Sequence, residues 1–294
     1  GIGMSGWMPY FIAMLIILGG MLPVWAATQR SEMPPQLMLA KRFQGEETLN
    51  LFGVSEKYDG VRAFWDGMSL VTRSGRIINA PDWFLAQLPD EPMDGELWLG
   101  YGRFSEVSGL IRRKDSDTSE LWQDVSYMVF DLPELPGTFD ERYQALISLI
   151  GNPSEVAAYE NFHPVEQLRV SSQQELDTLL QQVLERGGEG LMLHRWDSFY
   201  FAGRSSDLLK VTPLEDAEAI VTGYEPGQGR LKGMMGALRV RLQNGREMLL
   251  GTGFSDAERQ SPPALGARVR FTFRGLTADG LPRFASFDRV RPPE

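Results

Sequence analysis

SEKYDGVRAFWDG, residues 55–67, contains a single lysine, Lys57, which is followed by one Asp-Gly pair and, at the end of the stretch, by a second. Residues 61–65 and 69–73 are two short strand-like runs on either side of the second pair. Asp and Gly tolerate the positive φ that tight turns demand, so this pattern predicts a β-hairpin. Lys57 therefore stands just before a hairpin, either as a surface charge or as a nucleophile that its neighbours hold in place.

The composition favours a globular chain of about two domains. The chain has 294 residues, of which 43% are hydrophobic, enough for a sizeable core at about 150 residues per domain. It has no cysteine and two histidines, which excludes disulfides and thiolate metal sites and argues against a histidine-based zinc or iron site. Any metal would therefore be a hard cation held by oxygen ligands.

Charge is distributed unevenly along the chain, whose net charge is -10. From residue 213 onward there are 12 Lys and Arg against 10 Asp and Glu, a net of +2, so the preceding part carries -12. The overall acidity argues weakly against a nucleic-acid partner, because phosphates are held mainly by Lys and Arg. The mildly basic C-terminal part is the one suited to such a partner.

The N-terminal segment is typical of a targeting sequence. Residues 1–27 carry no charged side chain, and residues 10–22, YFIAMLIILGGML, are dominated by apolar residues. This length suits the apolar region of a signal peptide better than a membrane span, which needs about 20 residues. We expect residues 1–27 to direct export to the periplasm. An uncleaved membrane anchor is the alternative, because no Lys or Arg precedes the apolar run.

Helical periodicity predicts three helices after the hairpin. A short amphipathic one covers residues 81–88. Residues 140–150 and 172–186 repeat apolar side chains at the i, i+3, i+4 spacing of a helix with one buried face. Ser172 and Glu175 have the spacing of a capping box, which predicts the start of the last helix.

Strand patterns complete the expected organisation. Buried-type runs occur at ELWLG, VSYMVFDL and EGLMLH, residues 96–100, 125–132 and 189–194. From about Pro213 the chain changes to about five short strands separated by turns, which predicts a small closed or nearly closed β-barrel. The expected segments are a signal peptide or anchor, 1–27, a first domain, 28–212, and a barrel domain, 213–294.

Lys57 gains interest from its neighbours and from residues further along the chain. Arg62 lies five residues later, where a hairpin can return its guanidinium to the side of the lysine. A nucleophilic lysine must lose its proton, so it needs desolvation or a cationic neighbour. Each later residue has an ordinary structural explanation by itself, but the ordered set is unusual: Asp94, Glu96, Phe130, Glu189 and Lys210.

The ordered motifs EKYDGVR, TRSG, DGELW, YMVFDL, EGLMLH and LLKVTP resemble the six-motif signature of covalent nucleotidyltransferases. The compact layout, GRLKGMMGALRV in the expected barrel and RFASFDRVR near the end resemble the minimal ATP-dependent DNA ligases of bacteria, of the periplasmic E type. The resemblance covers nearly everything after residue 35. It implies an α/β nucleotidyltransferase (adenylation) domain followed by a small all-β OB-fold barrel.

The resemblance also implies a reaction and its residues. The lysine that matches Lys57 attacks the α-phosphate of ATP and forms lysyl-AMP; AMP then passes to a DNA 5′-phosphate, and a 3′-hydroxyl closes the nick. Glu189 and Lys210 would assist as catalytic residues. Asp59 and Glu189 would hold Mg²⁺, for which Mn²⁺ can substitute. The nucleotide contacts implied are Glu56, Arg62, Glu96, Phe130 and Lys210.

The implied partner is nicked double-stranded DNA, bound by a monomer without a stable protein partner. Arg73 would hold the phosphate of the nicked strand. A basic run in a polar loop, a glycine-flanked pair and an arginine near the C-terminus would contact DNA. The residues expected to bind DNA are Arg73, Arg112, Arg113, Arg230, Lys232 and Arg283.

One position departs from the family pattern. Thr212 stands where the family usually has a second lysine, so a phosphate step would be slower here, unless a barrel cation such as Lys232 compensates. Two other functions remain open at this point. One is an RNA ligase or guanylyltransferase of the same superfamily, and the other is a catalytically weak DNA-binding protein. His194 is expected to be structural, and His163 is given no role.

Overall fold

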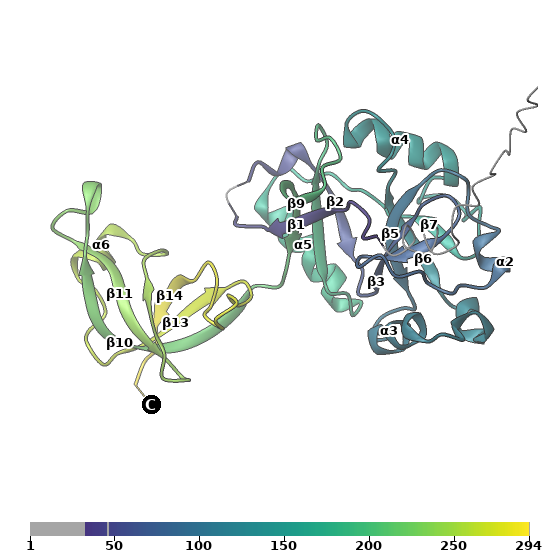
Figure 1. Ribbon diagram of the computed structural model, residues 1–294. Helices are drawn as coiled ribbons and strands as arrows, with labels where there is room; N and C mark the ends of the chain where they lie inside the picture. The colour runs from purple at the N-terminus through teal and green to yellow at the C-terminus, as the bar shows by residue number, and fades with distance from the viewer. Residues whose placement is uncertain (1–32, 46, 294) are drawn as a thin grey trace, which may run out of the picture.

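The computed structural model describes residues 33–45 and 47–293, so the predicted signal peptide lies outside the described residues. Figure 1 shows two bodies joined through the segment between strands β9 and β10. The first body contains two sheets, with strand orders β1-β9-β8-β2 and β4-β3-β5-β6-β7, and the second contains one, β12-β11-β10-β13-β14. The expected α/β domain followed by an all-β domain is confirmed.

The first sheet is formed by segments from both ends of the first domain. Its strands, in spatial order, are β1 (Met38–Arg42), β9 (Gly203–Val211), β8 (Gly190–Arg195) and β2 (Phe52–Lys57). β1 runs parallel to β9, and the other neighbours are antiparallel. Helix α5 (Gln173–Glu185) packs on β8 and buries its apolar stripe in the same core as Leu191 and Leu209. Helix α5 therefore covers one face of this sheet, and the opposite face forms one wall of the cavity described below.

The second sheet contains the predicted hairpin. Its strands are β3 (Val61–Trp65), β4 (Leu70–Thr72), β5 (Met93–Trp98), β6 (Ser126–Asp131) and β7 (Phe162–Pro164). The turn between β3 and β4 holds Gly67 at φ +97°, as a tight hairpin turn requires. Gly60 does not have a positive φ. A side chain there would collide with the Leu97 carbonyl, so close backbone approach explains this glycine rather than turn geometry.

Helices cover this sheet, and the predicted ones form with small differences. The second sheet is packed by α3 (Phe104–Arg112) and α4 (Phe139–Ile150), of which α3 was not predicted. The expected helix at 81–88 is regular only over α2 (Asp82–Leu85). Short 3₁₀ turns occur at Leu49–Leu51, Ser116–Thr118, Glu120–Gln123 and Gly229–Leu231.

The predicted capping box of α5 forms only in part. The Ser172 hydroxyl accepts a hydrogen bond from the Glu175 N–H at 3.2 Å, as expected. The Glu175 carboxylate accepts instead from the N–H and hydroxyl of Ser171, at 3.0 and 3.2 Å. The reciprocal bond to Ser172 is therefore replaced, because Ser171 offers the carboxylate two donors instead of one.

The C-terminal domain is a five-stranded antiparallel sheet with its own core. Its strands are β10 (Glu215–Pro226), β11 (Met235–Leu242), β12 (Glu247–Leu250), β13 (Arg268–Phe273) and β14 (Ser286–Val290), with one short helix, α6 (Asp256–Gln260). The Phe287 N–H donates to the Thr252 carbonyl at 2.8 Å, which brings β14 against the end of β12. The predicted closed or nearly closed barrel is compatible with this strand order and with the contact between β14 and the end of β12.

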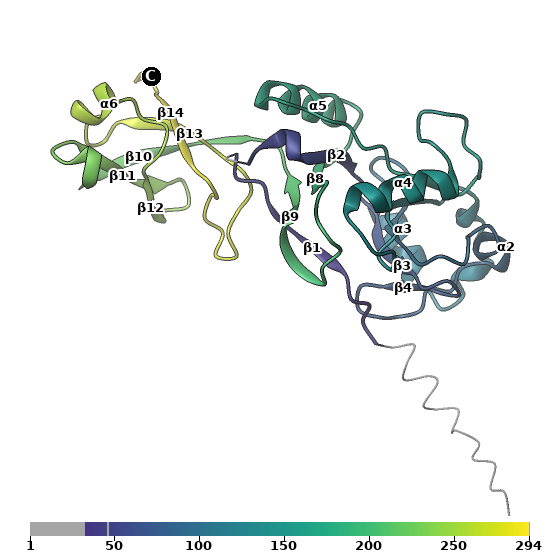
Figure 2. The ribbon, with the colours of Figure 1, turned by 90° about the horizontal axis from the view of Figure 1, so that it is seen from above.

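The two domains touch at one seam. Arg274 of the barrel donates a hydrogen bond to the Thr212 carbonyl at 2.8 Å, and its guanidinium lies 5.7 Å from the centre of the Phe43 ring. Elsewhere the barrel extends away from the first domain (Figure 2). Within residues 33–45 and 47–293, no helix is long and apolar enough to cross a membrane.

Candidate active site

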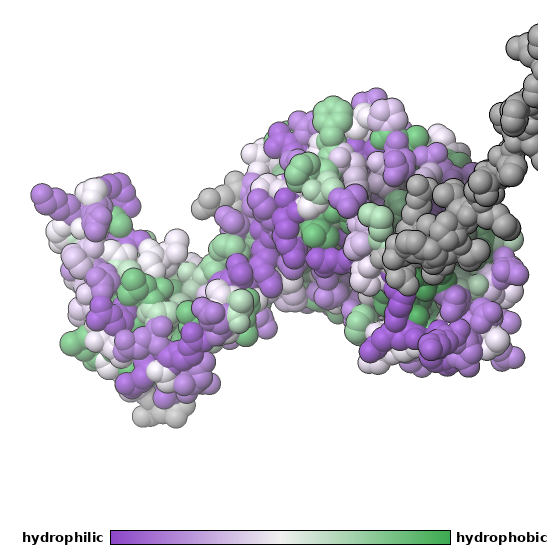
Figure 3. All heavy atoms as spheres, viewed as in Figure 1, coloured by the Kyte–Doolittle hydropathy of each residue, from purple (hydrophilic) through white to green (hydrophobic). Residues whose placement is uncertain are grey.

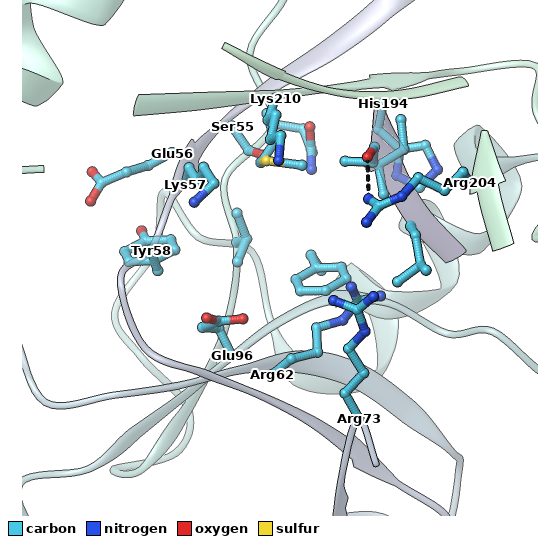
Figure 4. Close-up of a pocket in the computed structure, with 17 residues that line it drawn as sticks. Ser55, Glu56, Lys57, Tyr58, Arg62, Arg73, Glu96, His194, Arg204 and Lys210 are labelled. Atoms are coloured by element: carbon cyan, nitrogen blue, oxygen red, sulfur yellow. Dashed lines mark hydrogen bonds between the residues drawn. The ribbon is translucent and has the colours of Figure 1, made fainter. Parts of the chain in front are cut away.

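A cavity of about 290 Å³ lies between the two sheets of the first domain. Lys57 and Lys210 reach it from the first sheet, and they face Arg62, Arg73 and Glu96 from the second (Figure 4). The other lining residues are Leu39, Ala40, Ser55, Glu56, Tyr58, Phe130, Val165, Gln167, Met192, His194, Arg204 and Leu208. The lining thus includes all five residues predicted to contact the nucleotide, together with Lys57.

Lys57 is the last residue of β2 and is held beside a carboxylate. It pairs with Gly190 at the start of β8, which brings the preceding residue, Glu189, next to the lysine. The Lys57 Nζ donates to Glu189 Oε1 at 2.8 Å, and both side chains are partly exposed, at 27% and 41%. The predicted nucleophile and the predicted metal ligand are therefore in direct contact.

Arg62 is fixed by a partner that the sequence did not identify. Its Nε and Nη2 donate to the two carboxylate oxygens of Asp94, at 2.8 and 2.7 Å, and Nη2 also reaches the Met38 carbonyl at 2.9 Å. Asp94 is fully buried and accepts a further bond of 2.7 Å from the Tyr200 hydroxyl. The guanidinium lies 5.0 Å from the centre of the Phe130 ring, so these contacts orient both nucleotide-binding candidates.

Glu56 points away from Lys57 and Lys210, although it immediately precedes the lysine (Figure 4). Its carboxylate accepts hydrogen bonds from the Tyr101 hydroxyl at 3.0 Å and from Arg186 Nη2 at 2.8 Å. Consecutive residues of a strand point to opposite faces, which explains the divergence. To contact a nucleotide as predicted, the Glu56 side chain would have to break its hydrogen bond with Arg186 and turn toward the cavity.

Glu96 lies on β5 directly opposite Arg62 on β3. Burial raises the pKa of Glu96 to about 7, and the positive charges of Arg62 and Lys57 only partly offset this effect. A carboxyl group with such a pKa exchanges its proton near neutral pH. It can therefore accept a hydrogen bond from a sugar hydroxyl in one state and donate one in the other.

This titration predicts a pH effect on stability. The pKa of Glu96 is about 7 in the folded protein and 4.5 for the ordinary group, so between these values the folded protein retains a proton that the unfolded chain has lost. Stability present below about pH 4.5 is therefore lost as the pH rises toward 7. Glu96→Gln should flatten this part of the thermal unfolding profile, whereas Glu247→Gln, an exposed control, should not. Equal slopes for parent and Glu96→Gln would contradict the assignment.

Lys210 is the centre of a group of cations. Burial lowers the pKa of Lys210, and nearby positive charges lower it further. These charges belong, in decreasing order of effect, to Arg42, Lys57, Arg204 and Arg283. Hydrophilic side chains gather over the region where β1 and β9 lie (Figure 3). A cavity with this concentration of cations suits an anion with several charges, such as a polyphosphate.

Asp59 and Glu189 form a limited set of oxygen donors for a metal. Burial and the charge of Glu189 raise the pKa of Asp59, so the two carboxylates influence each other. Among the described residues, no group of three or more His, Asp or Glu side chains is arranged so that it could hold a metal ion. Two carboxylates are still sufficient for Mg²⁺, which commonly binds one or two of them together with substrate phosphates. The donor set fits such an ion.

Most of the residues predicted to bind DNA lie away from the cavity. Only Arg73 lines it. Arg112 is the last residue of α3 instead of lying in a loop, and its guanidinium donates to the Ser108 hydroxyl at 2.8 Å and to the Ser108 carbonyl at 3.2 Å. The others are on exposed loops or turns, where Arg113 pairs with Asp115, Arg230 with Asp256, and Arg283 donates to the Leu276 carbonyl.

Lys232, predicted to compensate for Thr212, is distant from it in this arrangement. Thr212 precedes β10, and Lys232 follows it. The 12 residues of this strand span roughly 40 Å at about 3.3 Å per residue. Any charge that assists Lys210 in the arrangement seen here must come from elsewhere.

His194 has the structural environment that was expected. It is buried, and its ring stacks on Phe139 with centroids 3.6 Å apart. Burial, followed by the charges of Arg142 and Arg62, lowers its pKa well below the usual value. It therefore stays neutral and packs against the back of the cavity.

Family comparisons match both halves of the chain. A family model described as ATP dependent DNA ligase domain matches residues 37–212, and one described as DNA ligase OB-like domain matches residues 226–291. A DNA ligase from Haemophilus influenzae is 33% identical over 239 residues, which cover 81% of this chain and 86% of the relative.

Solved structures agree with this result. A structure from a structure-function analysis of Lig E DNA ligases is 44% identical, with a TM-score of 0.57, and the match covers 88% of this chain and 100% of the other. The Chlorella virus DNA ligase-adenylate, 21% identical with a TM-score of 0.52, covers 88% of this chain and 100% of its own, and supports the fold alone.

Proposed function

The chain belongs to the ATP-dependent DNA ligases, and from this premise we propose that Lys57 is the residue that carries AMP while the protein seals nicks in duplex DNA. The observation that supports this assignment is the placement of Lys57 at the end of a strand, within a cavity lined by Lys210, Arg204 and Arg73. The cations around the Lys57 amine favour the approach of an anionic substrate such as ATP to this residue.

The proposed first step transfers AMP to the protein. The Lys57 amine, having lost a proton, forms a bond from Nζ to the α-phosphorus of ATP, and the bond from this phosphorus to the bridging oxygen breaks. Pyrophosphate leaves with the electron pair. A 5′-phosphate oxygen of the nick next displaces the lysine from the same phosphorus, and finally the 3′-hydroxyl oxygen displaces AMP from the 5′-phosphate.

The side chains of the cavity would divide the work of binding. Phe130 offers a ring face for adenine, and Glu96 lies where it can accept from ribose hydroxyls. Lys210 would stabilise the charge that develops on the α-phosphate oxygens. Arg62 reaches the cavity with its orientation set by Asp94, so it enters binding without further loss of conformational freedom.

We also propose that Asp59 and Glu189 hold Mg²⁺, with Mn²⁺ as a substitute. Such an ion neutralises phosphate charge and polarises the phosphorus that is attacked. In the described structure, Glu189 instead accepts a hydrogen bond from Lys57. The second oxygen of this carboxylate, Oε2, would bind the metal while Oε1 faces the Lys57 amine.

The duplex would be gripped by both domains. Arg73 lies in the cavity, where it can hold the phosphate of the nicked strand, whereas Arg230 and Lys232 lie at the far end of the barrel strands. We propose that the barrel swings to enclose the DNA, as a monomer, so that these separated cations meet one duplex. Binding carried by phosphate contacts should weaken steeply as salt concentration rises.

Nick sealing is the experiment that tests this proposal. The protein, incubated with ATP, Mg²⁺ and a 5′-phosphorylated nicked duplex, should give a continuous strand, and labelled ATP should leave AMP on the protein. A nick without the 5′-phosphate is the control. GTP labelling in place of ATP, or preferred sealing of an RNA nick, would point to another enzyme of the superfamily. Absence of both label and sealing would leave only a DNA-binding role.

We further propose that the protein is exported to the periplasm. Support comes from the uncharged, apolar stretch at residues 10–22, followed by the small residues Ala26 and Ala27. The mass of the mature N-terminus should correspond to cleavage after this segment. An unprocessed chain that fractionates with membranes would favour an anchor instead.

A further inference from the structure

A row of four residues crosses the first sheet on the face that forms the cavity. Strand pairing aligns Ser55 of β2 with Met192 of β8, Met192 with Lys210 of β9, and Lys210 with Arg42 of β1. Directly paired residues point to the same face of a sheet. Ser55, Met192 and Lys210 all line the cavity, so Arg42 extends the same row by one strand.

The neighbours of Arg42 confirm which way it faces. Successive side chains of a strand alternate between the two faces. Phe43 is buried in the core beneath helix α5, and Lys41 pairs with Leu209, which belongs to that core as well. Arg42, which lies between them, therefore points to the other face, toward the cavity.

The charge of Arg42 acts on the site and is not neutralised by a carboxylate. After burial, Arg42 is the largest cause of the lowered pKa of Lys210, ahead of Lys57. No salt bridge to Arg42 or Lys210 occurs among residues 33–45 and 47–293. Two adjacent cations without an acidic partner are stabilised by an anion that binds both.

The order of the strands gives this anion a direction. Lys57 belongs to β2, and Arg42 lies three strands away, roughly 14 Å at about 4.8 Å per strand. In phosphoryl transfer, the attacking and leaving atoms lie roughly in line through the phosphorus. A phosphorus attacked from the β2 side would therefore release its leaving group toward Lys210 and Arg42.

We propose that Arg42 binds the pyrophosphate end of ATP and receives the departing pyrophosphate, an inference that rests on the proposed function of Lys57. It supplies the second positive charge beside Lys210 that Thr212 cannot, and it does so from the first domain. The reaction is the first step described above, in which the α-phosphorus gains the bond to Nζ and pyrophosphate leaves with the electron pair.

The barrel leaves room for this guanidinium. A Cβ atom at Gly275 would lie 2.6 Å from Arg42 Nη1, so the guanidinium occupies space that a larger residue there would take, and Gly275 also has a positive φ of +67°. The adjacent Arg274 packs on Phe43 and bonds the Thr212 carbonyl. Arg42 therefore lies at the contact between the two domains, where a pyrophosphate bound to it would also lie close to the barrel.

Arg42→Ala tests the proposal through three measurements on the full-length protein. Single-turnover adenylation should require at least about tenfold more ATP, as expected for the loss of one charged hydrogen-bonding partner. Pyrophosphate-driven release of AMP from the adenylated protein should fall by a similar factor. Sealing of a nick that already carries AMP, which involves no pyrophosphate, should change far less. Arg42→Lys should recover part of the loss.

Lys41→Ala provides the matched control, since it removes one positive charge from the adjacent residue on the opposite face of β1. It should leave all three measurements near those of the parent. Equal losses in adenylation and in sealing of the AMP-carrying nick would show that Arg42 serves DNA or the fold, and no loss in any measurement would also overturn the proposal. A parent protein that forms no lysyl-AMP would refute the proposed function instead, which keeps the two failures distinct.

Discussion

Lys57→Arg should lose formation of the AMP-protein adduct by at least about 10⁴-fold, the scale of loss seen when a covalent nucleophile is removed. The guanidinium retains the positive charge and can keep the contact with Glu189, now 2.8 Å from the amine, so the fold should persist. It stays protonated under all ordinary conditions and cannot attack phosphorus. The measurement is retention of label from α-labelled ATP on the denatured protein.

The control for this variant is Lys41→Arg, a similar exchange on the other face of the same sheet. Lys41 donates a hydrogen bond to Ser206 Oγ at 3.2 Å and does not line the cavity. It should label like the parent. Persistent labelling of Lys57→Arg at the parental rate would assign the nucleophile to another residue and would remove the basis for the proposed role of Lys210 as well.

Arg142→Met should reduce the free energy of unfolding of the first domain by about 3–5 kcal/mol, because it leaves a buried carboxylate without its counter-charge. Arg142 and Asp131 are 0% and 1% exposed, and they share two hydrogen bonds of 2.8 and 3.2 Å. Arg142 also donates to the carbonyls of Gly137 and Ser198. Its loss would loosen both the end of β6 and the segment after β8.

Tryptophan fluorescence during urea unfolding measures this effect in the domain concerned. Five of the seven tryptophans lie between residues 65 and 196, the other two lie in residues 1–27, and none lies in the barrel domain, so the unfolding signal comes from the first domain and not from the barrel. Arg195→Met is the matched control, because Arg195 pairs with Asp197 in an exposed setting, and it should cost less than about 1 kcal/mol. Equal losses in the free energy of unfolding for Arg142→Met and Arg195→Met would show that burial does not explain the contribution of the Arg142–Asp131 pair to stability.

A second variant separates charge from packing. Asp131→Leu combined with Arg142→Met replaces the buried pair by apolar side chains and should recover much of the lost stability, as such replacements do elsewhere. If the double variant is no more stable than Arg142→Met alone, the arginine acts mainly through its backbone contacts with Gly137 and Ser198.

The predictions that succeeded depend on short-range patterns. The hairpin after Lys57 follows from Asp66 and Gly67, α4 follows from its apolar spacing, and α5 follows from its apolar spacing together with Ser172 and Glu175 at its start. In these cases the residues that determine the conformation lie within one turn or one strand of each other. Helix α3 shows the limit, because its apolar side chains, Val107, Leu110 and Ile111, span a single short run between loops and were not recognised.

The site contains partners that no local pattern could identify. Arg62 was predicted to hold phosphate, but its orientation comes from Asp94, 32 residues later, and from Tyr200, 106 residues beyond Asp94. Glu56 was expected at the nucleotide, yet Tyr101 and Arg186 draw its carboxylate to the other face. The placement of such groups depends on which distant strands pair, and the residue types alone are compatible with several pairings.

Local patterns in the sequence were enough to predict the hairpin, the helices α4 and α5, the family and the residues available for chemistry, because turn glycines, helical spacing and ordered motifs act over a few neighbouring residues. Only the tertiary structure decided that β9 lies between β8 and β1, and hence that Lys210 and Arg42 stand side by side although 168 residues separate them. Backbone hydrogen bonds between strands are the same for every side chain, so register is decided by how both faces of the sheet are buried. The apolar face under α5 fixes that register, and the cations on the opposite face take their positions from it.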